Sequence, residues 1–238
     1  MKKSIFTTIL CLCLFLAQKV CQAQVQRWSV GASVFVANYQ GDLVEQLLAL
    51  KETKLGISAA IRYQLMPRFG VRAQLQTMQL SGNDNNSELL SQRGFSFRSN
   101  LLHYGLILDY QPFAKRRFDA LGYHISNVSP YVVAGIGNTI FETTCKGMKT
   151  DNPDIGIKIP KNNFTLQGGI GFKWDKNERI SIAIEGNTYL MQTDYLDGVS
   201  HSGKPNNRDW YVTGGIMLQY WLGNVPEKMK PVNPLNVH

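Results

Sequence analysis

The sequence predicts an all-β protein: an eight-stranded antiparallel up-and-down transmembrane β-barrel with periplasmic termini. Three observations lead to this prediction: apolar residues that alternate with polar or small ones, connections that alternate between short and long, and an N-terminal stretch typical of exported proteins. Residues 210–222 show the alternation most clearly, because every second position from Val212 is apolar or glycine. A stretch of 13 residues exceeds the roughly 9–11 that a tilted strand needs to cross a bilayer. We interpret it as the closing strand.

Seven further stretches have the same two-residue period. Pro67 and Pro112 each end one of them, since proline cannot donate to a strand ladder. The connections after the second and sixth stretches are tight, whereas those after the first, third, fifth and seventh are long, as in outer-membrane barrels. The residues that mark the expected strands lie, in chain order, at 28–39, 55–66, 71–76, 102–110, 131–141, 164–174, 180–185 and 210–222. The long loops are expected at 38–53, 81–95, 142–161 and 193–209.

The N-terminus predicts export. Residues 1–23 combine basic Lys2 and Lys3, an apolar core and small Ala23, as in a cleaved secretory signal peptide. We therefore expect a signal peptide at 1–23, an outer-membrane barrel at 24–222, and a proline-rich periplasmic tail at 223–238. The expected location is the outer membrane of a Gram-negative envelope.

Charge and cysteine content exclude other classes. Removal of the signal leaves 22 of the 25 basic side chains against 17 acidic ones, a modest excess without the aromatic-interleaved basic stripe of a nucleic-acid-binding protein. Cys145 is then the one cysteine left, so we expect no internal disulfide. We expect it to be a free thiol in a polar loop at 142–161. The alternative to a cleaved signal peptide at 1–23 is a lipoprotein signal, in which Cys21 would be acylated.

The polar positions of the strands predict a filled interior. If the apolar positions face lipid, the opposite positions point inward, and an eight-stranded barrel is only wide enough to be filled by side chains. We predict a lumen polar network of Arg62, Arg72, Gln74 and Glu185, with Glu185 as a partner of the arginines. The same parity directs further polar residues inward, namely His103, Asp109, Gln167, Lys173 and Asn187.

Catalytic and cofactor signals are weak. His103 lacks a Ser/Asp spacing that would specify a triad, and no cluster of residues has metal-ligand spacing. The glycines at 135–137 and 168–171 lie inside expected strands without a following helix, so they do not form a phosphate loop. We expect no catalytic residue, no cofactor and no metal.

Four stretches, in order along the chain, carry a family resemblance: 38–43 (NYQGDL), 115–118 (KRRF), 129–137 (SPYVVAGIG) and 193–200 (TDYLDGVS). On these the chain resembles the PorG-like outer-membrane barrels associated with the type IX secretion system. The similarity runs over nearly the whole mature chain. An insertion at about 119–128 is where this sequence departs from the family. The family-motif loop is represented here by Asp194, Tyr195, Leu196 and Asp197.

The resemblance implies a non-enzymatic structural component that links the outer membrane to a periplasmic ring of lipoprotein and partner subunits. Lys115, Arg116 and Arg117 are then candidate partner contacts. The end of the closing strand also resembles the signal read by the barrel assembly machinery during insertion. Expected partners are outer-membrane lipid, the ring subunits and that machinery, with no nucleic acid.

Three other classes fit parts of the pattern. The first is a generic OmpA/OmpX-like barrel that serves adhesion or envelope stability through its long loops. The second is a lipid-modifying barrel enzyme, and the third is a soluble lipocalin-like barrel. Genomic context, lipid A analysis and membrane fractionation discriminate among them.

Overall fold

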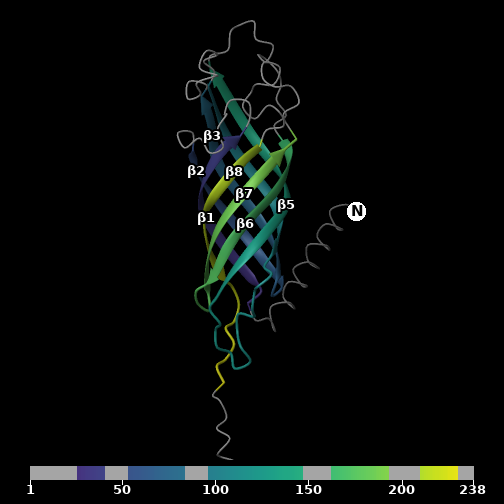
Figure 1. The fold of residues 1–238 in the computed structure, drawn as a ribbon, viewed down its shortest axis with the longest axis vertical. Helices are drawn as coiled ribbons and strands as arrows, with labels where there is room; N and C mark the ends of the chain where they lie inside the picture. The colour runs from purple at the N-terminus through teal and green to yellow at the C-terminus, as the bar shows by residue number, and fades with distance from the viewer. Residues whose placement is uncertain (1–25, 41–52, 84–95, 147–161, 193–209, 230–238) are drawn as a thin grey trace, which may run out of the picture.

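The computed structural model describes residues 26–40, 53–83, 96–146, 162–192 and 210–229. Its strands form one closed antiparallel barrel in which each strand pairs with its neighbours in the chain and β8 pairs with β1 (Figure 1). The predicted eight-stranded up-and-down barrel is therefore confirmed. The strands are β1 (Trp28–Gln40), β2 (Lys54–Met66), β3 (Phe69–Asn83), β4 (Ser96–Tyr110), β5 (Asn127–Lys146), β6 (Asn162–Asp175), β7 (Ile180–Met191) and β8 (Trp210–Trp221).

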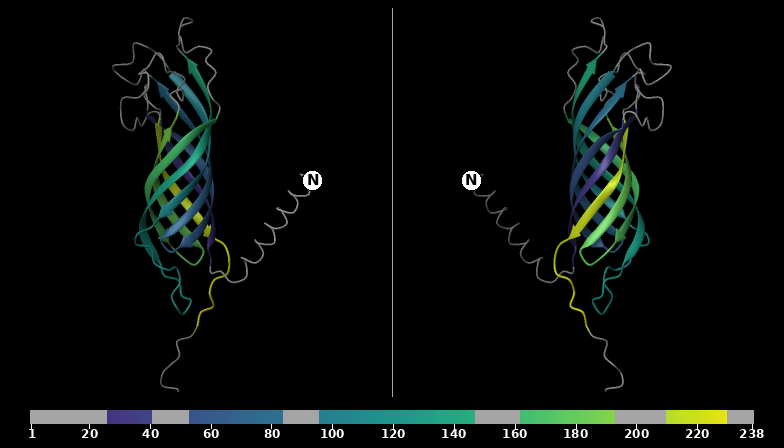
Figure 2. Two further views of the ribbon diagram at one scale, coloured as in Figure 1. Left: turned by 90° about the vertical axis from the view of Figure 1, so that its right-hand side faces the viewer. Right: turned by 90° about the vertical axis from the view of Figure 1, so that its left-hand side faces the viewer.

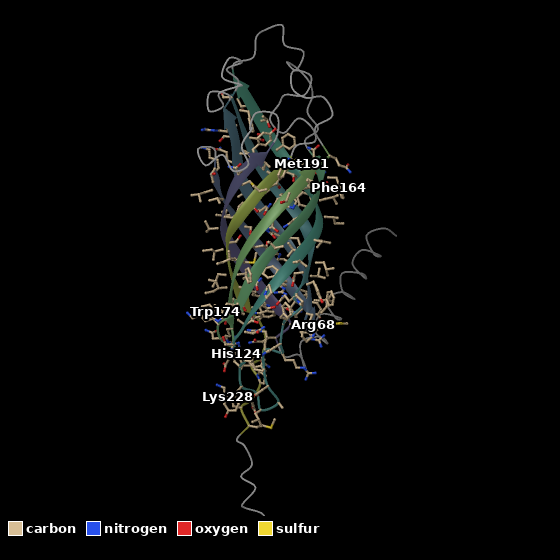
Figure 3. All side chains as sticks on the ribbon, in the orientation of Figure 1. Arg68, His124, Phe164, Trp174, Met191 and Lys228 are labelled. Atoms are coloured by element: carbon tan, nitrogen blue, oxygen red, sulfur yellow. The ribbon has the colours of Figure 1, made fainter. Side chains whose placement is uncertain are left out.

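Strand parity decides which side chains face outward. In β6, Ile170 is 69% exposed and Phe172 is also exposed, whereas Gln167 and Lys173 on the opposite parity are buried. Successive side chains of a strand point to opposite faces, so the apolar set covers the outside and the polar set fills the inside. The side chains accordingly project both outward from the ribbon and into the barrel (Figure 3). Among the described residues there is no helix long and apolar enough to span a bilayer.

The two ends of the barrel differ. At one end lie the β2–β3 and β6–β7 turns, the β4–β5 connection (residues 111–126), and residues 26–27 and 222–229; we call this the turn end. At the other, the loop end, β1, β3, β5 and β7 finish and their successors begin. The strands tilt strongly against the long axis, and the barrel is closed on every side (Figure 2).

Local sequence explains the tight turns. Pro67 lies between β2 and β3, where Gln64 Nε2 donates to Met66 O at 2.6 Å and stabilises the turn. Asn177 Oδ1 accepts hydrogen bonds from the backbone N–H groups of Arg179 and Ile180, at 2.9 and 2.7 Å. An asparagine that binds backbone two or three residues onward is a common turn device.

Two strands, β3 and β5, extend farther toward the loop end than the sequence predicted. β3 continues to Asn83, past the expected start of the loop at 81–95, whereas β4 begins at Ser96, where that loop was expected to end. Apolar Leu80 and Phe97 are buried inside and keep the two strands paired. β5 was expected to end near residue 141 but reaches Lys146. Cys145 therefore belongs to a strand paired with Phe97, and its expected place in a polar loop was wrong.

Barrel closure requires a close approach at Gly215. This residue of β8 pairs with Phe35 of β1, and a Cβ atom at position 215 would overlap both Phe35 Cβ and Val34 O. At the adjacent Gly214, no atom of the described residues lies within 4 Å of an added Cβ. The two neighbouring glycines thus differ sharply in the room around them.

We predict that Gly215→Ala lowers the free energy of unfolding by about 1–3 kcal/mol, the usual cost of overpacking. Gly214→Ala is the matched control and should leave it unchanged within about 0.5 kcal/mol. Urea unfolding of the refolded barrel, followed by tryptophan fluorescence, measures both. Equal stability of the two variants would contradict the described β1–β8 register.

Candidate functional site

The interior has two layers. Toward the loop end, buried apolar and aromatic side chains from several strands form one cluster, which includes Phe35, Leu80, Phe97 and Phe141. Toward the turn end, the inward residues are mainly charged or polar. The candidate functional chemistry therefore lies in the turn-end half and in the segments that cover it.

Glu185 is the centre of one polar network. Arg72 Nη2 donates to Glu185 Oε1 at 2.9 Å, so Glu185 pairs with one of the two arginines proposed from the sequence. Tyr131 Oη donates to Glu185 Oε2 at 2.7 Å, and Asn187 Nδ2 donates to Oε1 at 2.7 Å. The carboxylate thus receives three donors, and this arrangement compensates a buried charge.

Arg62 has a different partner from the one the sequence suggested. It forms an ion pair with Asp109, which also accepts a hydrogen bond from Gln111 Nε2 at 3.0 Å. Gln74, also predicted for the network, donates to Gln76 Oε1 at 3.0 Å, and Tyr189 Oη lies 3.2 Å from the same oxygen. All four predicted lumen residues are buried, but they belong to three separate groups.

His103 lies wholly inside the barrel, where it is 1% exposed. Its Nδ1 is 2.9 Å from Thr139 Oγ1, which is 2.8 Å from Thr165 Oγ1. The imidazole meets the ring of Tyr189 edge-on, with centroids 5.1 Å apart. This packing keeps His103 out of reach of a lipid on the outer surface.

Trp221 closes the interior at the turn end. It is fully buried, and its Nε1 donates to Ser181 Oγ at 2.7 Å. The Ser181 hydroxyl donates in turn to Asp175 Oδ1. The guanidinium carbon of Arg117 lies 4.0 Å from the Trp221 ring centroid, a close cation–π contact. Trp221 shares the inward parity of β8, but its partners in β6, β7 and the β4–β5 connection had no sequence signal.

Arg117 connects the covering segments to the barrel. Its Nη1 donates to Gln26 Oε1 at 2.8 Å, and its Nη2 donates to the carbonyl oxygens of Asn177 and Glu178 at 3.3 and 3.2 Å. Burial lowers the pKa of the guanidinium to about 10, although nearby Asp175 opposes the shift. At neutral pH Arg117 is therefore still a cation, and it is committed to contacts within the chain.

The structure separates the predicted basic trio. Lys115 and Arg116 are exposed, whereas Arg117 turns inward to Gln26 and Trp221. The three therefore differ in exposure and in contacts, although each also lines a cavity at the turn end. The family-motif residues Asp194, Tyr195, Leu196 and Asp197 lie outside the described residues, as does the expected signal peptide.

The β4–β5 connection and residues 222–229 cover the turn end together. Ile125 N donates to Arg117 O at 2.8 Å, and Met229 N donates to Leu121 O at 3.0 Å. Gly122 has φ +84° and packs directly against the chain at Glu227, where a side chain would collide. Lys228 forms an ion pair with Glu178 at 2.9 Å. Figure 3 shows His124 and Lys228 beyond the barrel at this end.

A cavity of about 550 Å³ lies between the turn end of the barrel and these covering segments. Basic side chains dominate its charged lining, and both inward and outward residues of the barrel contribute to it. The lining includes Arg27, Leu65, Met66, Lys115, Arg116, Arg117, Asp119, Lys173, Asp175 and Glu227. Within the described ranges, no group of three His, Cys, Asp or Glu residues is placed to hold a metal ion.

Comparison with known families finds one match, described as "Domain of unknown function (DUF6089)", over residues 3–229. The comparison with curated proteins finds no match.

Among solved structures, the chain is similar to three proteins named as surface or outer-membrane proteins. Ail of Yersinia pestis is 9% identical with a TM-score of 0.41, covering 83% of this chain and 99% of Ail. OprG of Pseudomonas aeruginosa is 14% identical with a TM-score of 0.43, covering 84% and 98%. Neisserial surface protein A is 11% identical with a TM-score of 0.45, covering 80% and 96%. These names assign no function to this chain.

We predict that Glu185→Gln lowers the free energy of unfolding by about 3–5 kcal/mol, because Arg72 keeps its buried charge without a carboxylate partner. Replacing the exposed Glu142 of β5 by Gln is the control and should change stability by less than about 0.5 kcal/mol. Denaturant titration in detergent measures both. If the Glu185 variant is as stable as the Glu142 variant, the network does not stabilise the barrel.

Proposed function

We propose that this chain, which belongs to the DUF6089 family, is a non-enzymatic outer-membrane β-barrel that serves as a structural component of type IX protein secretion. In this proposal the barrel anchors a periplasmic ring complex to the membrane.

The apolar outer surface of the barrel is the main support for membrane insertion. Every strand exposes large apolar side chains on its outward parity, which would be unfavourable in water at about 25 cal/mol per Å². Soluble monomers rarely expose more than a few hundred Å² of continuous apolar surface. One outward residue from each strand, in order, is Val34, Ile57, Leu75, Leu106, Ile136, Ile170, Ile184 and Leu218.

The height of this surface suits a bilayer. Outward aromatic residues near the turn end include Trp28, Trp174 and Tyr220, as expected at a membrane interface. In β6 the outward set runs from Phe164 to Trp174, which Figure 3 places toward opposite ends of the barrel. Ten residues at about 3.3 Å each, tilted by about 40°, span about 25 Å, the usual height of the apolar band.

The filled interior supports an anchoring role. Two buried ion pairs, Arg62–Asp109 and Arg72–Glu185, compensate four of the inward charges, and the layer above them is packed with aromatic and aliphatic side chains. Such an interior gives a rigid cylinder. His103, the residue considered for lipid chemistry, is enclosed within it, which disfavours the lipid-modifying alternative.

Orientation follows from the connections. Outer-membrane barrels have short periplasmic turns and longer external loops, so we place the turn end in the periplasm. The β4–β5 connection and residues 222–229 then form a periplasmic surface on which Lys115 and Arg116 are exposed. This surface suits a partner with acidic groups.

The link to type IX secretion is supported by the sequence resemblance at 38–43, 115–118, 129–137 and 193–200. A generic barrel for adhesion or envelope stability is the second candidate. It is favoured by the extension of β3, β4 and β5 toward the loop end, where external contacts would be made.

We predict that the native protein fractionates with the outer membrane and captures type IX ring subunits after cross-linking. Charge reversal by Lys115→Glu with Arg116→Glu should reduce that capture at least about tenfold, since attraction becomes repulsion. Arg98→Glu, an exposed change on β4 at the loop end, is the matched control. Quantitative pull-down measures the loss.

Three outcomes discriminate among the readings. Recovery in the aqueous fraction would contradict membrane insertion. Membrane recovery without any ring subunit would leave the generic barrel as the better account. Equal capture by the wild type and the Lys115/Arg116 variant would exclude this surface as the docking site.

A further inference from the structure

The cavity at the turn end has an unbalanced charge. Five basic side chains line it, namely Arg27, Lys115, Arg116, Arg117 and Lys173, against three acidic ones, Asp119, Asp175 and Glu227. Its volume of about 550 Å³ is in the range of small-molecule sites. The excess of positive charge favours an anionic ligand.

The nearby carboxylates are mostly engaged elsewhere. Asp119 Oδ1 accepts hydrogen bonds from the backbone N–H groups of Leu121 and Tyr123, at 2.9 and 2.8 Å. Asp175 accepts a hydrogen bond from Ser181 Oγ and faces both Lys173 and Arg117 at 3.8–4.0 Å. One carboxylate that is shared in this way does not neutralise two cations.

Lys173 is the inner residue of the site. It is 4% exposed, and its Nζ forms an ion pair with Asp175 that is longer than a hydrogen bond. The nearest carboxylate oxygen, Asp175 Oδ1, is 3.8 Å away, and the Trp221 ring centroid is 5.5 Å away. An ammonium group carries three donors, and an ion pair at 3.8 Å engages none of them at hydrogen-bond distance. Lys173 therefore has donors available for a ligand in the cavity.

The rim of the cavity is continuous with the outer surface. Leu65 and Met66 line the cavity and are also exposed at the end of β2, Met66 to 64%. Lys115 and Arg116 line it from the β4–β5 connection. A ligand with an anionic head and an apolar portion would match both kinds of surface.

We propose that this cavity binds a phosphoryl group, held by Lys173 from inside the barrel and by Lys115 and Arg116 at the rim. Two sources supply such a group: a phospholipid headgroup of the adjoining leaflet, or a free phosphate. The lipid source rests on the membrane insertion proposed above; binding of the phosphoryl group itself does not.

The test uses the full mature chain, folded in octyl glucoside and titrated by calorimetry. The probes are dihexanoylphosphatidylglycerol, inorganic phosphate, and dihexanoylglycerol, which has the same acyl chains and no phosphate. We expect the phospholipid to bind and dihexanoylglycerol not to bind. Lys173→Gln and the double variant Lys115→Gln with Arg116→Gln should each weaken binding at least about tenfold, the effect of losing charge-assisted hydrogen bonds.

Lys176→Gln is the matched control, because it removes the same charge from an exposed position at the same end and should leave affinity unchanged. If Lys173→Gln fails to fold, the rim variant carries the test. Binding of the phospholipid without binding of inorganic phosphate identifies a headgroup site. Binding of inorganic phosphate with equal affinity identifies a free-phosphate site. The proposal is overturned if neither phosphate probe binds, if dihexanoylglycerol binds equally, or if neither the Lys173 nor the rim variant binds more weakly than the Lys176 control.

This experiment separates the inference from the proposed function. It is performed in detergent without ring subunits, so it is independent of location and partner. Conversely, Lys173 lies inside the barrel, so Lys173→Gln should leave ring capture intact even where it abolishes phosphate binding.

Discussion

Antiparallel pairing of β1 with β8 is the constraint on which the rest of the structure depends. It runs from Ser29 opposite Trp221 to Gln40 opposite Trp210, and it leaves the sheet without a free edge. An unpaired backbone edge is prohibitive in hydrocarbon, so closure is what makes an apolar outer surface usable in a bilayer. The close approach of Gly215 to Phe35 is part of the same requirement.

Closure with eight strands also fixes the interior. A cylinder this narrow must be filled by its own inward side chains, so the charges on the inward parity have to find partners within it. Arg72 of β3 pairs with Glu185 of β7 across the barrel, and Arg62 of β2 pairs with Asp109 of β4 over the intervening strand β3. At the turn end, Arg117 and Lys173 lie over the ring of Trp221, so cation–π contacts take part in holding these charges. Arg117 comes from the β4–β5 connection, one of the segments that cover this end.

Period-two alternation predicted the strands because lipid-facing and inward positions differ in polarity at every step. The alternation did not predict the end of β5, which continues beyond the apolar band to Lys146. In this extension, Thr143 and Thr144 place polar residues on both faces of the strand, so no alternation marks it. Parity also predicted that Arg62, Arg72, Gln74 and Glu185 point inward. Parity does not say which inward residues pair with one another, so the Arg62–Asp109 pair, which forms over Gly70 of the intervening strand β3, was not anticipated.

At the turn end, the sequence pattern predicts side-chain contacts even less well. Lys115, Arg116 and Arg117 are adjacent in sequence and were expected to act together, but only the path of the β4–β5 connection decides that Arg117 turns toward Gln26 and Trp221. No local pattern encodes that path. The cavity likewise depends on segments that are distant in sequence, 111–126 and 222–229, which meet through contacts such as Met229 N to Leu121 O.

The most direct test of the account is the environment of the outward face of β6 in lipid vesicles. Single cysteines at Leu166, Ile170 and Phe172, in a chain with Cys145 replaced by Ser, carry a fluorescent label and are exposed to quenchers. The account predicts strong quenching by a lipid-soluble quencher and weak quenching by a water-soluble one at all three positions. Strong quenching by the water-soluble reagent at these positions would contradict a lipid-facing barrel.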